Sequence, residues 1–309
     1  MSETGEVMTR GGVRPLHGVL PPIPTPFTGD TVDTAAMEAN VGRWMDTRIS
    51  GVVVLGSNGE APFLDEAESD AVIAAARDQV SSDRFCIVGV GRESTIGTIR
   101  AAKRAAALGA DAVLARTPSF FKPLLTAEAF VSHYMAAAEA SQVPVLLYNF
   151  TALTGVTIPV DVVSKLSEHG NIVGIKESGS DLKYLSALVD HTPDDFIVMA
   201  GSAPVFYPSL VMGASGGILA LASVVPNLCV ELYELAGRGE HADARELQRR
   251  LTPLAGLVTS VYGIPGLKAA LSMQGFTVGT PRAPIRPIST SGIDTIRAEL
   301  ERLGVSCSA

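Results

Sequence analysis

The stretch NIVGIKESGSD, residues 171–181, contains an apolar run that ends abruptly in a cation. Ile172, Val173 and Ile175 are typical of a strand that is covered on both faces. Lys176 follows directly, although lysine is almost never buried unless it is paired or functional. The place of this lysine in the fold therefore decides whether it is a surface side chain or a reactive one.

Seven further apolar runs occur along the chain, and they alternate with Ala-rich segments of helical periodicity. The expected strands cover 18–25, 51–56, 86–91, 112–117, 145–149, 172–177, 197–201 and 217–220. Segment 65–80 has the clearest helical pattern, and Asp65 followed by Glu68 predicts a capping box at its start. Eight successive βα units predict an α/β fold of the (β/α)8 TIM-barrel type.

The chain after residue 225 contains more helix than one barrel unit requires. We therefore expect the barrel to span 17–225 and a C-terminal helical region, 226–309, to complete and extend it. Residues 1–16 are expected to be a flexible leader, because they lack the apolar core of a secretion signal and carry acidic residues.

Composition and spacing argue against several classes of protein. The net charge is −8 without a basic block, which argues against a nucleic-acid partner, and no apolar run reaches the roughly 20 residues of a membrane span. Three widely spaced cysteines predict reduced thiols and a cytoplasmic location. The five histidines have no ligand spacing, which argues against a metal-dependent aldolase. The segment GVGRES, 89–94, lacks the third glycine of a dinucleotide loop.

In a TIM barrel the active site lies at the C-terminal ends of the strands. Lys176 ends the sixth expected strand, Tyr148 ends the fifth, and the loop GSNGE, 56–60, follows the second. Strand alternation predicts that Lys176 shares a face with Gly174 and Ile172, with Gly174 leaving room for the lysine stem. An apolar surrounding would favour the neutral amine, which is a nucleophile.

The other two rim features have a functional and a structural interpretation. The Tyr148 phenol could serve as an acid and base beside the amine, or it could be a core aromatic with one hydrogen bond. The glycines of 56–60 could bring backbone amides close to an anion, with Ser57 and Asn58 as additional donors, or the segment could be a tight turn.

Together, GSNGE, the YN that ends strand five and GIKES on strand six resemble the dihydrodipicolinate synthase/N-acetylneuraminate lyase family, over residues 18–288. The resemblance implies a (β/α)8 barrel with a C-terminal helical extension, a homotetramer, and no metal or cofactor. It also implies a Schiff base between Lys176 and a 2-oxo acid, and proton transfer by Tyr148 with Ser57. The substrate carboxylate would be bound by Ser57, Asn58 and Gly59.

Details within the motifs separate the branches of this family. Dihydrodipicolinate synthases carry an arginine five positions after the strand-five tyrosine, where this chain has Leu153. GSNGE, NIVGIKESG, AGSA (200–203) and GIPGLK (263–268) look most like 4-hydroxy-2-oxoglutarate aldolases, whereas ALTG resembles the sialic acid lyases. Ser178 matches a substrate-contacting serine of the aldolase branch. The expected substrate-binding set therefore also includes Leu153, Ser178, Gly201 and Ile218.

The resemblance predicts a class I aldolase that cleaves a 4-hydroxy-2-oxo acid, such as 4-hydroxy-2-oxoglutarate, to pyruvate and an aldehyde. One alternative is an N-acetylneuraminate lyase-like enzyme or a 2-keto-3-deoxy sugar acid aldolase or dehydratase; another is a non-catalytic 2-oxo acid binder. Two positions depart from the family. Thr151 replaces a proline, and Phe120 replaces a tyrosine that crosses a dimer interface to complete a proton relay.

Overall fold

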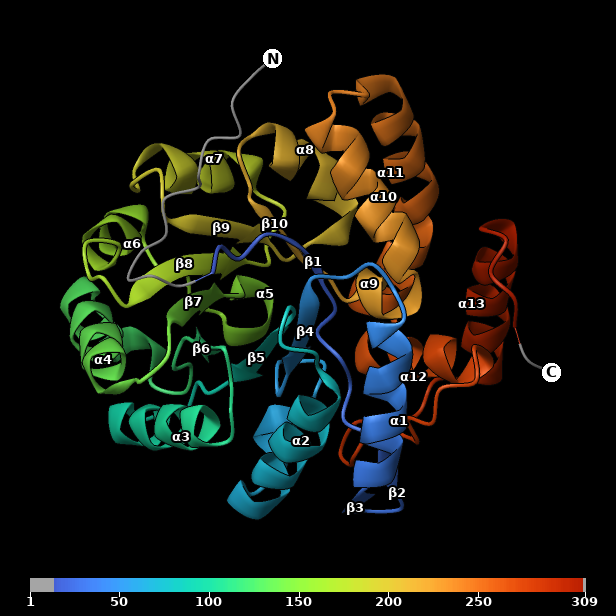
Figure 1. The fold of residues 1–309 in the computed structure, drawn as a ribbon, viewed down its shortest axis with the longest axis horizontal. Helices are drawn as coiled ribbons and strands as arrows, with labels where there is room; N and C mark the ends of the chain where they lie inside the picture. The colour runs from blue at the N-terminus through green and yellow to red at the C-terminus, as the bar shows by residue number, and fades with distance from the viewer. Residues whose placement is uncertain (1–13, 308–309) are drawn as a thin grey trace.

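The computed structural model describes residues 14–307, and its centre is a parallel sheet of eight strands in the order β1-β10-β9-β8-β7-β6-β5-β4 (Figure 1). This confirms the predicted barrel, and each strand lies within or next to its predicted range. The strands are β1 (Gly18–Leu20), β4 (Gly51–Val54), β5 (Phe85–Gly89), β6 (Ala112–Arg116), β7 (Val145–Asn149), β8 (Ile172–Glu177), β9 (Ile197–Ala200) and β10 (Gly216–Ile218).

The two ends of the sheet, β1 and β4, meet at an irregular seam. Ser50 donates its amide to the Val19 carbonyl, and Val53 exchanges backbone bonds with Pro21 and Ile23 on either side of Pro22. A proline supplies no amide to a ladder, so regular pairing stops there while the remaining bonds bring the ends together. The barrel is therefore nearly closed.

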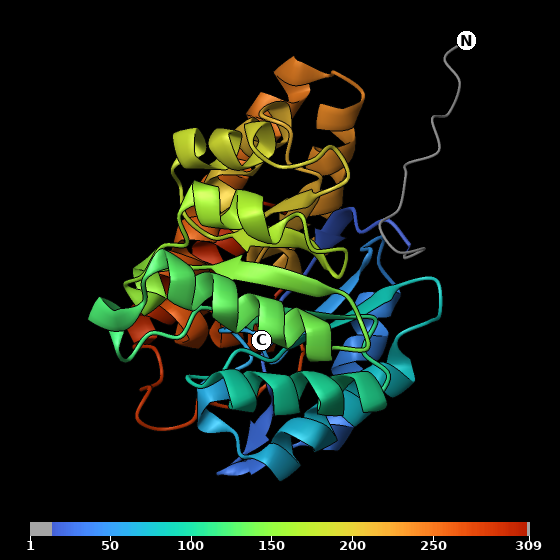
Figure 2. The ribbon, with the colours of Figure 1, turned by 90° about the vertical axis from the view of Figure 1, so that its left-hand side faces the viewer.

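Helices cover the outer face of the strands, and Figure 2 shows α3 and α4 side by side across that face. The capping box predicted at the start of α2 is present, with Asp65 and Glu68 each accepting from the other's amide. A short hairpin, β2 (Phe27–Thr28) with β3 (Thr31–Val32), was not predicted. The covering helices are α1 (Thr34–Met45), α2 (Glu66–Gln79), α3 (Thr95–Ala107), α4 (Ala127–Ala140), α6 (Val160–Leu166), α7 (Leu182–Asp190) and α8 (Phe206–Val211). Two short helices, α5 (Thr151–Thr154) and α9 (Leu221–Val224), closely follow β7 and β10.

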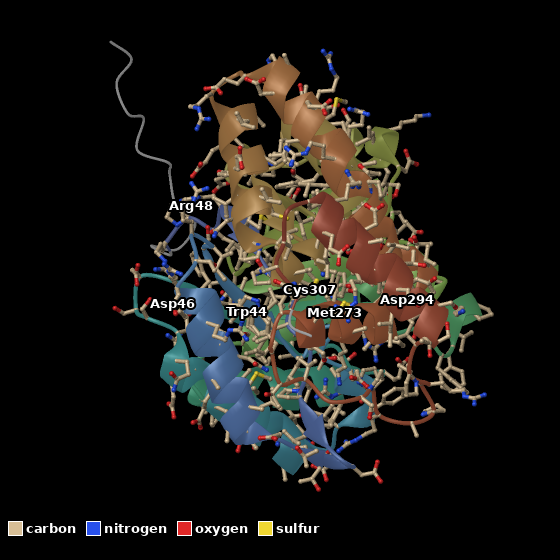
Figure 3. All side chains as sticks on the ribbon, turned by 90° about the vertical axis from the view of Figure 1, so that its right-hand side faces the viewer. Trp44, Asp46, Arg48, Met273, Asp294 and Cys307 are labelled. Atoms are coloured by element: carbon tan, nitrogen blue, oxygen red, sulfur yellow. The ribbon has the colours of Figure 1, made fainter. Side chains whose placement is uncertain are left out.

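The C-terminal helices pack beside α1, and Figure 3 shows Trp44 of α1 on the side of the molecule where these helices lie. The Trp44 ring stacks on Phe276 at 4.8 Å, and its indole nitrogen donates to the Ser223 carbonyl. The helical segments after the barrel strands are α10 (Pro226–Gly237), α11 (His241–Gly256), the π-helical turn 257–261, α12 (Gly263–Met273) and α13 (Thr290–Arg302).

We retain the division into 17–225 and 226–309 as a proposal. Most of the expected leader, residues 1–13, lies outside the described residues. The three cysteines, Cys86, Cys229 and Cys307, are unpaired. Among the helices of residues 14–307, none is both long and apolar enough to cross a membrane.

Side chains inside the barrel form a cluster separate from the larger core between strands and helices. The inner cluster includes Leu114, Leu146, Tyr148 and Met199, whereas their chain neighbours Val113 and Ala115 belong to the outer core. This is the period-two alternation expected of strands that close into a barrel. This inner face ends at the C-terminal rim of the barrel, where Lys176 and Tyr148 lie.

The predicted faces of β8 were partly wrong. Ile172 lies in the outer core and Val173 in the inner cluster, the reverse of the expectation, because the pairing of β7 with β8 shifts register at Val145. Such an irregularity places one extra residue in a strand and changes the face of its neighbours. Beyond it the alternation holds again, so Ile175 points outward and Lys176 inward.

Gly174 is required for a reason other than the one expected. A Cβ at this position would lie 2.3 Å from the Ile197 carbonyl oxygen and 2.8 Å from the Ile197 Cβ. The glycine therefore permits the close approach of β9, rather than making room for the stem of Lys176.

A buried ion pair joins the loop after β4 to the C-terminal region. The Lys268 ammonium, on α12, lies 2.7 Å from a Glu60 carboxylate oxygen, and the lysine side chain is only 2% exposed. The other Glu60 oxygen accepts the Arg282 amide, and Lys268 also donates to the Thr280 carbonyl. Burial lowers the pKa of Lys268, although Glu60 opposes this effect. GSNGE and GIPGLK, two distant motifs of the sequence, thus meet in one charge pair.

We predict that Lys268→Met destabilises the fold by about 3–5 kcal/mol, because it leaves the Glu60 carboxylate buried without its cation. Adding Glu60→Gln should recover part of the loss, since the buried charge is then removed. The free energy of urea unfolding checks both. Lys103→Met, at an exposed site on α3, is the control and should not change it. Equal effects of the Lys268 and Lys103 substitutions would contradict the prediction.

Candidate active site

One row of side chains crosses four strands at the C-terminal rim. Strand register pairs Arg116 on β6 with Tyr148 on β7, Tyr148 with Lys176 on β8, and Lys176 with Met199 on β9. Tyr148 and Met199 belong to the inner cluster, and register partners in a parallel sheet point to the same face. All four side chains therefore enter the mouth of the barrel.

Lys176 is a buried lysine without a carboxylate partner among the described residues. It is 4% exposed, and its Nζ lies 4.3 Å from the centre of the Tyr148 ring. Among the described residues no carboxylate lies within ion-pair distance of it, in contrast to Lys268 with Glu60. An amine held in this way, when uncharged, is a nucleophile that can attack a carbonyl carbon.

The hydroxyl groups of Tyr148 and Ser57 lie within hydrogen-bond distance of each other, next to Lys176. The Tyr148 phenol oxygen lies 3.2 Å from the Ser57 Oγ, and either group can be the donor. Because the Tyr148 ring lies beside the Lys176 amine, one phenol contacts both the lysine and the loop after β4. A proton can move along such a chain of hydroxyl groups.

The loop GSNGE folds as two successive turns between left-handed residues, Leu55 with φ 54° and Glu60 with φ 55°. The Gly59 amide donates to the Gly56 carbonyl, and the Glu60 amide donates to the Ser57 carbonyl. The amides of Gly59 and Glu60 are therefore used within the loop. The predicted anion-binding site then consists of the amides of Ser57 and Asn58. The Asn58 side chain makes a 3.4 Å bond to the Pro22 carbonyl, which holds the loop against the β1 seam.

The other expected substrate-binding residues occupy different parts of the rim. Gly201 follows β9 and packs against Ser178, since a Cβ on Gly201 would lie 2.0 Å from the Ser178 Oγ. Ile218 is buried in the inner cluster on β10. Leu153, on α5, is 65% exposed, and Phe120 is 77% exposed and contacts Phe121 edge to face. In the single chain, Ile218 is buried and Gly201 packs against Ser178, whereas Leu153 and Phe120 are exposed.

Arg116 is the member of the row that the sequence analysis missed. It was assigned only to a strand, although the alternation of 112–116 places it on the inner face. Its guanidinium donates to a Glu93 carboxylate oxygen at 2.9 Å and to the Thr117 carbonyl. The register of β6 against β7 was the missing information, because it alone places Arg116 beside Tyr148.

Glu93 anchors the loop after β6. Its Oε2 accepts the amides of Ser119 at 2.8 Å and Phe120 at 2.9 Å, and its Oε1 accepts from Arg116. Burial raises the pKa of Glu93, but these amides and the guanidinium outweigh it and lower the pKa to about 2. The Glu93 carboxylate thus holds both the Arg116 guanidinium and the backbone of Ser119 and Phe120 in place.

Comparison with known proteins gives one family over almost the whole chain. The model of the dihydrodipicolinate synthetase family matches residues 15–303. A 4-hydroxy-tetrahydrodipicolinate synthase of Methanopyrus kandleri is 35% identical over 294 residues, which cover 94% of this chain and 97% of the relative. An uncharacterized DapA-like lyase of Halobacterium salinarum is 35% identical over 291 residues, with 94% and 95% covered.

Solved structures agree with this match. The crystal structure of dihydrodipicolinate synthase from Thermotoga maritima has a TM-score of 0.90 at 30% identity, and 94% of this chain and 99% of that chain are covered. The dihydrodipicolinate synthase of Aquifex aeolicus has a TM-score of 0.90 at 28% identity, with 95% and 100% covered. The similarity thus includes the barrel and the helices that follow it.

We predict that the carboxylate of Glu93 makes the stability of the fold depend on acid pH. Its pKa in the folded chain lies below the ordinary 4.5, so its contribution is fully present above pH 4.5 and is lost as the pH falls toward 2. Glu93→Gln should lower the free energy of unfolding near neutral pH, and its difference from wild type should shrink across that interval. Urea unfolding at several pH values measures it.

The control for this experiment is Glu246→Gln, since Glu246 is an exposed carboxylate that pairs with Arg249 on the same helix. This variant should unfold like wild type at every pH. A difference between Glu93→Gln and wild type that stays constant down to pH 2 would show that the carboxylate charge is not what anchors the loop.

Proposed function

The chain belongs to the dihydrodipicolinate synthetase family, whose members are pyruvate-dependent lyases, and we propose that it is a class I aldolase that cleaves a 4-hydroxy-2-oxo acid. The observation that carries this proposal is the buried Lys176, without a carboxylate partner, beside the Tyr148 phenol. The chemistry that suits this pair is attack of the amine on a 2-oxo group followed by proton transfer through the phenol.

In the proposed first step the Lys176 amine attacks C2 of the substrate, and water leaves as the iminium forms. The amides of Ser57 and Asn58 hold the C1 carboxylate, because the amides of Gly59 and Glu60 in the same loop already donate to backbone carbonyls. The positive iminium then accepts the electron pair of the C3–C4 bond. Cleavage leaves an enamine of pyruvate on the lysine and releases the aldehyde.

Tyr148 handles the proton of this cleavage. Its oxygen removes the proton of the C4 hydroxyl, and the same proton is returned to C3 of the enamine. Ser57, 3.2 Å away, shares a hydrogen bond with the phenol during both transfers. Hydrolysis of the iminium then releases pyruvate and frees Lys176. A positioned acid and base of this kind typically contributes about 10²–10⁴-fold to the rate.

The aldehyde end of the substrate separates this proposal from 4-hydroxy-tetrahydrodipicolinate synthesis, the activity for which several relatives are named. Synthases of that kind have an arginine at the position of Leu153, which here is an exposed apolar side chain. We propose that the aldehyde half differs accordingly, and that 4-hydroxy-2-oxoglutarate, which yields glyoxylate, is a substrate. Ser178 and Gly201, which pack together, lie at the same rim.

We further propose that the active form is a homotetramer. Several large apolar side chains of the rim loops are exposed in the single chain, as expected of a surface covered by another copy. They are Phe120, Phe121, Leu124 and Leu153. Phe120 can fill the space of a tyrosine at such an interface but supplies no hydroxyl, so water must complete any relay through Ser57.

We predict that borohydride reduction in the presence of pyruvate attaches a pyruvyl group to Lys176, detected by mass spectrometry of peptides. Lys176→Arg should remain unlabelled, because a guanidinium stays protonated and does not attack. Lys268→Arg, a change at the other buried lysine, is the control and should still be labelled at Lys176. Labelling of another lysine in place of Lys176 would contradict the mechanism.

We also predict that the purified protein releases pyruvate and an aldehyde from 4-hydroxy-2-oxo acids, and that it condenses pyruvate poorly with aspartate semialdehyde. The physical reason is that Leu153 offers no cation at the position where those synthases hold the semialdehyde carboxylate with an arginine. Product analysis distinguishes the alternatives, since a dehydratase would yield a dehydrated oxo acid and a binder would yield no product. Efficient condensation with aspartate semialdehyde would refute the assignment.

A further inference from the structure

Arg116 lies on the inner face of the barrel beside Tyr148, and its inward course has a specific basis. A Cβ on Gly91, two residues after β5, would lie 2.4 Å from the Arg116 Cγ and 2.6 Å from the Arg116 backbone nitrogen. Gly91 follows the inner positions Phe85 and Ile87 at even spacing, so its open side also faces the mouth. The glycine thus provides the space in which the arginine stem crosses the inner rim.

The guanidinium retains hydrogen-bonding capacity after its contacts within the chain. One terminal nitrogen of Arg116 serves both Glu93 and the Thr117 carbonyl. Its Nε and its second terminal nitrogen have no hydrogen-bond acceptor among the described residues. The side chain is 25% exposed, so these donors are partly withdrawn from water, where a charged hydrogen bond is stronger than at an open surface.

The spacing along the row suits a bridging ligand. Arg116 and Lys176 are two strands apart, and adjacent strands lie about 4.8 Å apart, so their Cα atoms are about 10 Å apart. Tyr148, between them, must reach the C4 hydroxyl. A substrate held through C2 on Lys176 therefore passes Tyr148 at C4 and directs C5 toward the arginine.

We infer that Arg116 is a specificity-determining residue that binds the second carboxylate of the substrate, so that the preferred substrates are 4-hydroxy-2-oxo dicarboxylic acids. The inference rests on the proposed aldolase function and supplies the cation that Leu153 does not. A guanidinium with two open donors suits a carboxylate in a bidentate geometry. Glu93 holds the arginine head in place and leaves that side of it open.

The test compares two substrates that differ only at C5, 4-hydroxy-2-oxoglutarate and 4-hydroxy-2-oxopentanoate. Pyruvate release is measured for wild type, Arg116→Met and Arg116→Lys. Arg116→Met keeps the length of the side chain without its charge. Lys122→Met, which removes an exposed cation of the same loop, is the matched control.

Arg116→Met should lower kcat/KM on the dicarboxylate by about 10–100-fold, the worth of a charged hydrogen bond, and change it little on the monocarboxylate. Arg116→Lys should recover part of the difference, and Lys122→Met should keep the wild-type preference. An equal loss on both substrates would mean that Arg116 only supports the loop through Glu93, and this result would overturn the inference. A selective effect of Lys122→Met instead would also overturn it.

A second measurement needs no variant. On wild type, 2-oxoglutarate should compete for the site at lower concentration than 2-oxopentanoate, which lacks only the distal carboxylate. Equal inhibition by the two acids would overturn the inference even if Arg116→Met does not fold. Release of pyruvate from both substrates, without any preference, leaves the aldolase proposal standing and overturns only the role of Arg116. Release from neither, with no borohydride labelling of Lys176, refutes the aldolase proposal itself.

Discussion

Closing eight parallel strands into a barrel forces every second side chain of each strand into one shared interior, and the chemistry at the rim depends on this constraint. The register of β6 to β9 brings Arg116, Tyr148, Lys176 and Met199 to the same level. The inner face of the barrel beneath this row is apolar, so the polar groups of Arg116, Tyr148 and Lys176 can meet water only from the open mouth of the barrel. Lys176 is therefore buried beside the Tyr148 ring, without a carboxylate partner among the described residues.

The two buried lysines show how the same side chain can serve opposite purposes. Lys268 pairs with Glu60 and donates to the Thr280 carbonyl, and so it joins α12 to the loop after β4. Lys176 has a tyrosine ring where Lys268 has a carboxylate. The C-terminal region thereby contributes to the site without entering it, since Glu60 directly follows the turns that present Ser57 and Asn58.

Beyond the neighbouring strand β5, Glu93 organises the rim in a similar way. It draws together the backbone of Ser119 and Phe120 and the head of Arg116, so one carboxylate sets both a loop and a cation. The match to the family covers the barrel and the helices that follow it. In our proposals, Leu153 and Arg116 set the substrate of this chain while the lysine chemistry is kept.

The eight strands, the capping box at Asp65 and the rim positions of Lys176 and Tyr148 could be predicted from the sequence, because apolar runs, caps and chain order are local signals. Three other features depend on how the strands and distant segments come together. The register shift that turns Val173 inward has no local signature, since it is a property of two paired strands. The Glu60–Lys268 pair joins residues far apart in the chain. Arg116 became a candidate ligand only when strand pairing placed it beside Tyr148, because hydrogen-bond register between strands depends on the closed barrel as a whole.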